Sequence, residues 1–351
     1  MKILSSLEIK AVVEELQQLL GAKVDQVYQP DNTEVVLSLH RTDIGKKLLR
    51  IIPGTALYFT TKRRASPKEA LNFCRFLRKR LGPTKLKEII QKDMERIIEF
   101  HFEGKDTKFI LITEFFSKGN LIVCDKDYMI LSALQVQLWK DRKIKAKVKY
   151  EYPPKRKIFF EDFKEFSEFL DASTKENVVK TLALGLNLGG VYAEELCHRA
   201  QIDKNATKLK VAEQQRVYEE LKKLVEEELH PNMVNGNPVP ITMHSLGEGE
   251  SFPSYNDALD AYYSQYVEEA EETQEENKPK KNKYEEMLED QIKQKQQLEK
   301  AAEENQKKAE WIYNNYMDVK EFIELFKAKK REELKKRNVE IEGKNLLLEI
   351  E

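Results

Sequence analysis

The sequence predicts an α+β protein, with a strand-rich first half, a helical middle region and a long coiled-coil helix near its end. Runs of apolar residues separated by turn residues fill residues 23–135, which is typical of antiparallel strands. Helical periodicity dominates residues 162–229, and an uninterrupted heptad pattern begins at Tyr284. At 351 residues the chain is long enough for two or three domains with hydrophobic cores.

The first element is an amphipathic helix, predicted over residues 6–20. Ser5 and Glu8 have the spacing of a capping box, and Gly21 provides the stop. Charged side chains interrupt its apolar residues, so this helix is not a signal peptide. No segment of the chain has the roughly 18 uninterrupted apolar residues that a membrane span requires.

Strands are predicted in two groups, separated by a helix over residues 66–82. Pro67 stands at the favoured first helical position, and Gly82-Pro83 closes the helix. The strands are expected at residues 23–29, 33–40, 46–52 and 55–61 in the first group, and at 95–103, 108–115, 119–125 and 129–135 in the second.

The two parts of the chain differ in charge. Residues 1–150 hold 29 Lys and Arg against 18 Asp and Glu, whereas the remainder holds 31 against 43. A basic first half favours a polyanionic partner such as a nucleic acid, although a solvated basic face would give the same counts. The helix at 66–82 concentrates this charge, and we predict that four of its side chains contact nucleic-acid backbone: Arg75, Arg78, Lys79 and Arg80.

Cys74, Cys124 and Cys197 lie far apart in apolar segments, which predicts reduced core residues of a cytoplasmic protein. No two of them have the spacing of a zinc ribbon, and the five histidines are scattered without metal-ligand spacing. The sequence also lacks the phosphate-binding loop of NTPases, the dinucleotide fingerprint and the nucleophile elbow. We therefore predict no catalytic residues, no metal and no cofactor.

The segment at residues 189–203, GGVYAEELCHRAQID, joins a Gly-Gly turn, a short helix and a second turn. Such turns expose unpaired backbone N–H groups at helix starts, where a phosphate can bind, and glycine leaves room for a nucleic-acid strand. An ordinary helical hairpin would show the same spacing. We predict contacts with nucleic-acid backbone from Gly189, Gly190, Tyr192 and Arg199.

This segment resembles the helix-two-turn-helix of the formamidopyrimidine-DNA glycosylases. It is still more similar to the NFACT family of ribosome quality-control factors, in which GGxYAEExCxRAGID is typical. Other stretches resemble the same family across most of the chain: SSLEIKAVVEEL at 5–16, GAKVDQVYQPDNTEVVLSL at 21–39, ERIIEFHF at 95–102, LITEFFSKGNLIVCD at 111–125, NDALDAYY at 256–263 and WIYNNYMDV at 311–319.

The resemblance implies a two-lobed, β-rich N-terminal domain like that of the glycosylases over residues 1–172, followed by a helix-two-turn-helix domain over 173–267. A polar linker at 268–283 and a coiled coil at 284–335 come next. Residues 336–351 resemble the segment that introduces the family's NFACT-R domain. We therefore interpret the chain either as a truncated member or as one whose remaining part lies elsewhere.

The resemblance also implies a function. Members of the family bind the large ribosomal subunit obstructed by peptidyl-tRNA, recruit aminoacyl-tRNA and extend the stalled chain at its C-terminus without mRNA. The family's acidic residue in the first helix and its Asp-Arg pair opening a strand serve tRNA binding, and they fall on Glu8 and on Glu95-Arg96. Both aspartates are glutamate here, which keeps the charge but moves the carboxylate outward by one methylene. Expected partners are tRNA, rRNA and the large subunit, with no membrane, although a surface ion pair would also account for Arg96.

Two rival functions belong to other classes. A DNA-repair-like protein would use the same scaffold, but the glycosylases attack with an N-terminal proline followed by glutamate and end in a zinc finger. This chain begins Met1-Lys2, so the resemblance implies a scaffold without the nucleophile. A surface adhesin would need a signal peptide, which the sequence does not show. A non-enzymatic binding factor is the leading hypothesis.

The heptad seam requires a partner helix. Either two copies of the chain associate through it, or a returning strand lies beyond residue 351; one long helix lying on the body of the protein is the remaining alternative. The seam positions are Tyr284, Leu288, Gln291, Lys295, Leu298, Ala302, Asn305, Ala309, Ile312, Tyr316, Val319, Ile323 and Phe326.

Overall fold

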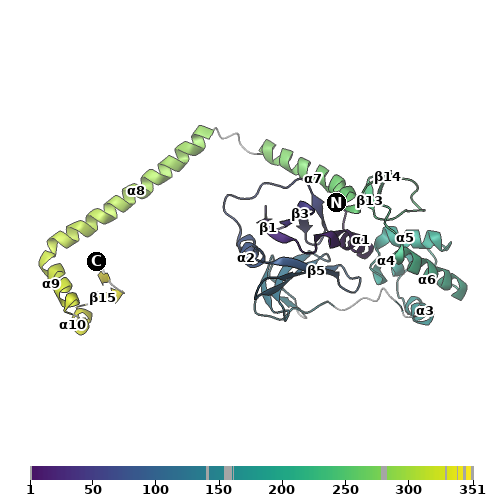
Figure 1. Cartoon of the computed structure of the whole chain (residues 1–351), viewed down its shortest axis with the longest axis horizontal. Coiled ribbons are helices and arrows are strands. Elements are labelled where there is room, and N and C mark those ends of the chain that lie inside the picture. The colour runs from purple at the N-terminus through teal and green to yellow at the C-terminus, as the bar shows by residue number, and fades with distance from the viewer. Residues whose placement is uncertain are drawn as a thin grey trace. The chain divides into compact units, whose positions relative to one another are not determined.

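The computed structural model describes residues 2–139, 142–153, 160, 162–277, 283–328, 330–337, 339–342 and 345–348. The chain forms two compact units, Met1–Thr273 and Gln274–Glu351 (Figure 1). The first unit contains a large antiparallel sheet and a group of helices, and the second is mostly helical. Within the described residues, no helix is long and apolar enough to cross a membrane.

A nine-stranded sheet forms the centre of the first unit. Every strand predicted from the sequence is present, with ends that differ by a few residues. From one edge to the other the strands are β4 (Ala56–Thr60), β3 (Gly45–Ile52), β2 (Val35–Arg41), β1 (Lys23–Tyr28), β5 (Lys85–Gln91), β6 (Ile97–Glu103), β7 (Lys108–Glu114), β8 (Asn120–Asp125) and β9 (Ile130–Ala133).

The division into two separate groups of strands is wrong, because β5 joins them. It pairs with β1 on one side and with β6 on the other. A β-bulge between Leu86 and Glu88 places the buried apolar residues at Leu86 and Ile89, three positions apart. This spacing breaks the alternation by which a strand is recognised in sequence, so β5 escaped prediction.

The two halves of the sheet repeat one plan. In each half a helix precedes a bulged strand that begins an antiparallel meander: α1 (Ser6–Leu16) precedes β1, and α2 (Asn72–Leu81) precedes β5. Lys23 and Lys85, the first residues of β1 and β5, are directly paired in antiparallel register. The halves are therefore related by an approximate two-fold axis at this pair.

The predicted ends of the two helices are partly confirmed. The capping box of α1 is present, with the Ser5 N–H 2.7 Å from Glu8 Oε2, and the helix ends before Gly21, whose φ is +86°. Helix α2 begins at Asn72, so the predicted start at Pro67 is wrong. Its buried stripe begins only at Phe73, and burial of an apolar face is what stabilises a short helix.

The helices α3 (Phe163–Asp171), α4 (Val178–Gly185), α5 (Gly189–Arg199) and α6 (Val211–Glu226) build a second core. Leu7 of α1 and Met94 of the β5–β6 turn are part of this core, so the helices pack against the beginning of the chain. Residues 231–256, which are rich in Pro, Gly, Asn and Ser, contain a small sheet of β12 (Asn232–Val234), β13 (Asn237–Val239) and β14 (Glu250–Ser251). Another short pair is β10 (Gln137–Leu138) with β11 (Lys143–Ile144).

Helix α7 (Tyr255–Asn277) returns to the first core, where Tyr255, Leu259 and Tyr263 are buried. The predicted domain of residues 173–267 thus contributes to both cores, and its proposed boundary at residue 172 lies inside one compact unit. Residues 268–277 of the predicted linker continue α7 and are therefore helical. Residues 278–282 of that linker lie outside the described residues.

The second unit contains α8 (Lys283–Asn314), α9 (Tyr316–Lys327), α10 (Arg331–Lys335) and a hairpin of β15 (Val339–Glu342) and β16 (Asn345–Leu348). The heptad region is helical, but Asn315 interrupts it with a φ of −111° and a ψ of 32°. The seam residues Leu288 and Leu298 are exposed. The coiled coil therefore remains a prediction that needs a partner.

Candidate nucleic-acid interface

Three segments that are far apart in the sequence meet at the start of α1. The N–H and hydroxyl of Ser6 donate to the carbonyl of Asn187, at 3.4 and 3.0 Å. The side-chain amide of Gln91 donates to the carbonyl of Ser6 at 2.8 Å and to that of Glu95 at 3.1 Å. Asn187 Nδ2 donates to Glu95 Oε2 at 2.8 Å. These bonds fix the β5–β6 turn and the segment before α5 to the N-terminus of α1.

Backbone conformation helps to position these segments. Asp93 and Met94 have φ values of 47° and 56°, and the turn is closed by a bond from Glu95 N–H to the Lys92 carbonyl at 2.7 Å. Asn187 has a φ of 57°. Among residues with a side chain, Asn and Asp adopt this left-handed region most readily. Glu95 is buried, while Arg96, which precedes β6, is half-buried and accepts the Phe115 N–H at 2.8 Å on its carbonyl.

Glu8 is held within the protein by three partners, and only 2% of it is exposed. Its Oε1 atom lies 2.5 Å from the Lys2 ammonium and 2.9 Å from the Tyr192 hydroxyl, which donates to it. Its Oε2 atom accepts the Ser5 N–H of the capping box. Burial, together with the charge of Glu8, raises the pKa of Tyr192 well above its usual value, so the hydroxyl remains a donor. The carboxylate predicted to serve tRNA binding thus acts by positioning its neighbours.

A cavity of about 500 Å³ opens beside this carboxylate. Helix α5 begins at its wall, and its N-cap residue, Leu188, provides no side-chain hydrogen bond to the first N–H groups of the helix. Gly189 has a φ of +78°, and a Cβ at Gly190 would meet no atom within 4 Å. The cavity is lined by Lys2, Ile3, Ser5, Glu8, Leu188, Gly189, Gly190, Val191, Tyr192, Val234, Asn235, Asn237, Val239, Leu246 and Tyr262.

Arg199 does not contact this cavity, and its predicted role at nucleic-acid backbone is replaced by a structural one. Its guanidinium donates to Glu195 at 2.6 Å, to Glu227 and to the Thr242 carbonyl at 2.8 Å. Glu195 is fully buried and also accepts the N–H groups of His244 and Ser245, at 2.9 and 2.8 Å. Glu195 and Arg199 thus connect α5 to the segment before β14.

We expect the Glu195 network to make stability depend on pH. Burial alone would raise the pKa of this carboxyl, but bonds from Ser245 and Arg199 outweigh burial and hold it below its ordinary 4.5. A carboxyl whose pKa is lower in the folded than in the unfolded protein stabilises the fold at pH values above its ordinary pKa. This contribution is lost as the pH falls through the pKa of the folded protein. The wild type should therefore have a higher melting temperature than Glu195→Gln at pH 7, and this difference should disappear as the pH falls below about 4.5. Melting temperatures of both proteins, measured from pH 7 to pH 3, test this prediction. A difference in melting temperature that does not depend on pH would contradict it.

The basic residues of α2 lie apart from the cavity, and two of them are engaged elsewhere. Arg78 donates to the Val27 carbonyl at 3.0 and 2.8 Å. The Arg80 guanidinium lies over the rings of Phe76 and Phe109, 5.5 and 5.8 Å from their centres. Arg75, Arg78 and Lys79 are exposed, and Arg80 is half-buried. Arg75 bonds only to Asn72 of its own helix, so Arg75 and Lys79 are the exposed cations of α2 that are not bonded to another element among the described residues.

Sequence reasoning missed Lys2, Gln91 and Asn187, which hold the site together. Asn187 carried a usable signal, since an Asn two residues before Gly-Gly favours a left-handed turn. Lys2 and Gln91 carried none, because their partners are remote in sequence. Among the residues that the structure describes, no group of His, Cys, Asp or Glu is arranged to hold a metal ion.

Residues 5–346 match the family described as NFACT N-terminal and middle domains. The archaeal Rqc2 homolog aRqcH of Methanocaldococcus jannaschii is 30% identical over 346 residues, covering 91% of this chain and 51% of that protein. The ribosome quality control complex subunit NEMF of Homo sapiens is 29% identical over 150 residues, 42% of this chain and 14% of NEMF. The chain thus spans about half the length of the archaeal relative.

Two solved structures share the fold. One is the N-terminal part of the fibronectin/fibrinogen-binding protein from Streptococcus suis, with a TM-score of 0.62 at 24% identity, covering 74% of this chain and 99% of that one. The other is the fibrinogen binding protein from Staphylococcus aureus, with a TM-score of 0.60 at 22% identity, covering 74% of this chain and 98% of that one. At these identities the similarity extends to the fold alone.

Proposed function

Because the chain belongs to the family with NFACT N-terminal and middle domains, we propose that it is a ribosome-associated quality-control factor. In this proposal it binds tRNA and the obstructed large ribosomal subunit, and it supports C-terminal tailing of the stalled chain without mRNA. It acts as a non-enzymatic binding factor in the cytoplasm. Relatives named as ribosome quality control proteins support the general role.

Glu8 and the start of α5 line one cavity, and Glu95, next to Arg96, is bonded to Asn187 two residues before α5; this arrangement carries the proposal. These residues lie far apart in the sequence, and each matches the family pattern. Arg96 follows the buried Glu95 and is half-buried. A guanidinium at this position can form two parallel bonds to a phosphate or a base edge.

The Glu8 and Glu95 carboxylates are too buried to act as direct RNA ligands in this arrangement. We propose that they position the turn before β6 and the start of α5, whose N–H groups suit a phosphate. A longer carboxylate in place of the family aspartate is compatible with this role, since each Glu is satisfied by partners on neighbouring elements.

Exposed apolar side chains near the α8–α9 bend support a contact with a large partner. Tyr313, Tyr316 and Met317 are 83%, 61% and 75% exposed. Contiguous exposed apolar groups mark interaction surfaces more often than they mark free surface. We propose that this part of the second unit contacts the large subunit, with self-association through α8 as the other use of the same helix.

Reversal of Arg75 and Lys79 to Glu should weaken tRNA binding, because exposed cations of α2 neutralise phosphates. The loss should be similar for different tRNAs, on the order of tenfold at low salt, and should shrink as salt rises. Arg78 and Arg80 are left intact, since their guanidinium groups serve the fold. Fluorescence anisotropy over a salt series measures this, and an unchanged affinity would identify this face as merely solvated.

The proposed function is tested by isolating the chain from cell lysate and sequencing the RNA bound to it. Large-subunit rRNA together with one or a few tRNA species is the expected result. Enrichment of DNA with damaged bases, without RNA, would instead support the DNA-repair-like alternative. A variant with Arg96→Ala provides the control for RNA that adheres without using the site.

A further inference from the structure

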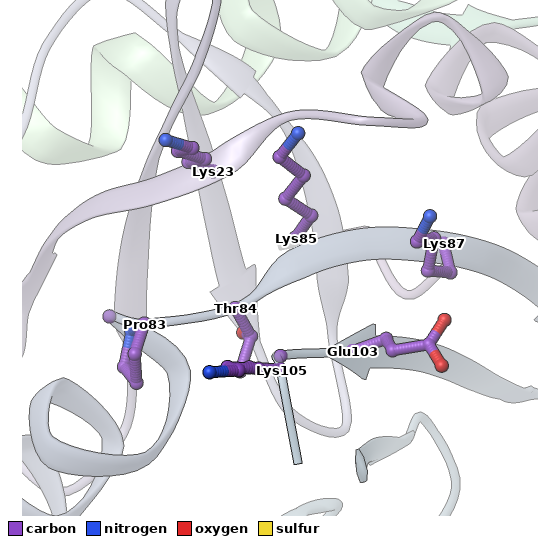
Figure 2. A pocket seen from close by; sticks show the side chains of 9 residues that line it. Lys23, Pro83, Thr84, Lys85, Lys87, Glu103 and Lys105 are labelled. Carbon is purple, nitrogen blue, oxygen red and sulfur yellow. The ribbon is translucent and has the colours of Figure 1, made fainter. Parts of the chain in front are cut away.

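A basic pocket lies where the two repeats of the sheet meet. It has a volume of about 380 Å³ and is lined by four lysines, one carboxylate and a short run of small residues around Pro83 (Figure 2). Lys23 and Lys85 come from the paired starts of β1 and β5, Lys87 lies further along β5, and Lys105 comes from the β6–β7 turn. None of these residues lines the cavity beside Glu8.

The register of the sheet brings these charges together. Lys23 is the direct partner of Lys85 across the β1–β5 junction, and Lys85 is the direct partner of Glu103 across β5 and β6. Lys85 and Lys87 are both exposed, whereas Leu86 between them is buried. Like charges directly opposite each other on neighbouring strands destabilise a sheet. The repulsion between Lys23 and Lys85 therefore lowers the stability of the sheet at this junction.

The lining of the pocket carries more positive than negative charge. Within the described ranges, the side chains of Lys23, Lys85, Lys87 and Lys105 form no ion pair or hydrogen bond. The one carboxylate of the pocket, Glu103, is paired with Lys108 at 2.8 Å. That hydrogen bond, and the charges of Lys108 and Lys87, lower the pKa of Glu103. Among the described residues, Glu103 is thus the one carboxylate in the pocket lining for four ammonium groups, and it is paired with Lys108.

Close backbone packing holds the Lys105 turn at the pocket. Gly104 N–H donates to the Thr107 carbonyl at 2.8 Å, which closes the turn. A Cβ at Gly104 would lie 2.8 Å from Thr107 Oγ1 and 3.3 Å from the Pro83 carbonyl, so the glycine permits this approach. The exposed Lys79 of α2 lies one helical turn before Gly82, which lines the pocket.

We propose that this pocket is a second RNA site, which binds phosphates of the backbone of a structured RNA. The proposal rests on the RNA-binding function proposed above and adds a site remote from the cavity. Lysine ammonium groups are compact charges that contact phosphates without reading base sequence. The pocket therefore anchors the RNA, and selectivity among RNAs comes from elsewhere.

The surroundings favour RNA over an acidic protein segment. Strands β1 and β5 are central and paired on both sides, so a peptide cannot add to the sheet at this point. Pro83 is the only apolar side chain in the lining, and no large exposed apolar residue accompanies the lysines. A protein partner would normally bury apolar anchors as well as charge.

The test replaces Lys23, Lys85 and Lys105 with Gln together, in the 351-residue chain. Binding of several purified tRNAs should weaken by at least about tenfold at low salt, equally for each tRNA, and the slope of log affinity against log salt should fall by about two to three. The melting temperature should stay the same or rise, because the repulsion at the β1–β5 junction is removed. The matched control replaces Lys126, Lys143 and Lys145, which are also exposed on this unit.

A second measurement uses sodium tripolyphosphate and needs no RNA. It should raise the melting temperature of the wild type and of the control variant, but not that of the pocket variant. Equal loss of tRNA binding in both triple variants would overturn the proposal, since charge alone would then account for binding. Stabilisation by tripolyphosphate without any binding of tRNA or rRNA would defeat both the RNA assignment and the proposed function. If the wild type binds tRNA normally and the pocket variant does too, only the pocket proposal fails.

Discussion

Replacing Glu8 with alanine is expected to lower the free energy of unfolding by about 3–5 kcal/mol, the usual cost of removing one partner from a buried ion pair. The Lys2 ammonium and the Tyr192 hydroxyl would lose their shared acceptor, and α1 would lose its capping box. Because Tyr192 lies on α5 and Lys2 at the chain start, the loss should loosen two walls of the cavity. Chemical denaturation measures the stability, and tRNA binding measures the effect on the site.

Three further variants separate charge from shape at this position. Glu8→Gln keeps the size of the side chain and should cost less than Glu8→Ala, because the amide oxygen can still accept from Tyr192. Tyr192→Phe removes one donor and should lower the free energy of unfolding by about 1–2 kcal/mol. The double variant with Glu8→Gln should lose less stability than the sum of the two single losses. Glu14→Ala, an exposed carboxylate of the same helix, is the control. If Glu8→Ala costs no more than Glu14→Ala, the buried network does not hold the site.

Replacing Arg96 with alanine is expected to lower tRNA affinity, or selectivity among tRNAs, by about ten- to a hundredfold. This corresponds to the roughly 1.5–3 kcal/mol of a lost charge-assisted bond. Binding to the large subunit should change less, because we propose that the second unit carries much of that contact. Arg96→Lys should restore little, since a single ammonium cannot replace a two-bond guanidinium contact. Filter binding with individual tRNAs and sedimentation with subunits give the two affinities.

Melting temperature must be measured for the same variants, because Arg96 lies at the start of a central strand of the sheet. Arg41→Ala is the matched control: it removes an arginine at the end of β2 that pairs with Asp43 at 2.6 Å. An Arg96→Ala protein that melts normally and binds tRNA as tightly and selectively as wild type would show that Arg96 is structural. Loss of stability without loss of tRNA affinity or selectivity would lead to the same conclusion.

The sequence by itself determined the local elements of the fold. Except for β5, the strands of the large sheet follow from side-chain periodicity and turn residues, and the capping box follows from the spacing of Ser5 and Glu8; all of these depend only on near neighbours. Charge counts identified the first half as basic. Family resemblance, and not any pattern of spacing, selected Glu8 and the Glu95-Arg96 pair.

Only the tertiary structure decided how these elements combine, because pairing between remote segments leaves no local pattern. The β1–β5 junction joined the two groups of strands, and a bulge had hidden β5 from the alternation rule. Burial determined whether each charged side chain is paired within the protein or exposed to a partner. Arg199 is paired with Glu195 and Glu227, whereas four lysines that strand register and a turn bring together form no ion pair among the described residues. Sequence names the charged residues, and the fold determines which of them are left for a partner, since desolvation and pairing depend on what packs against each side chain.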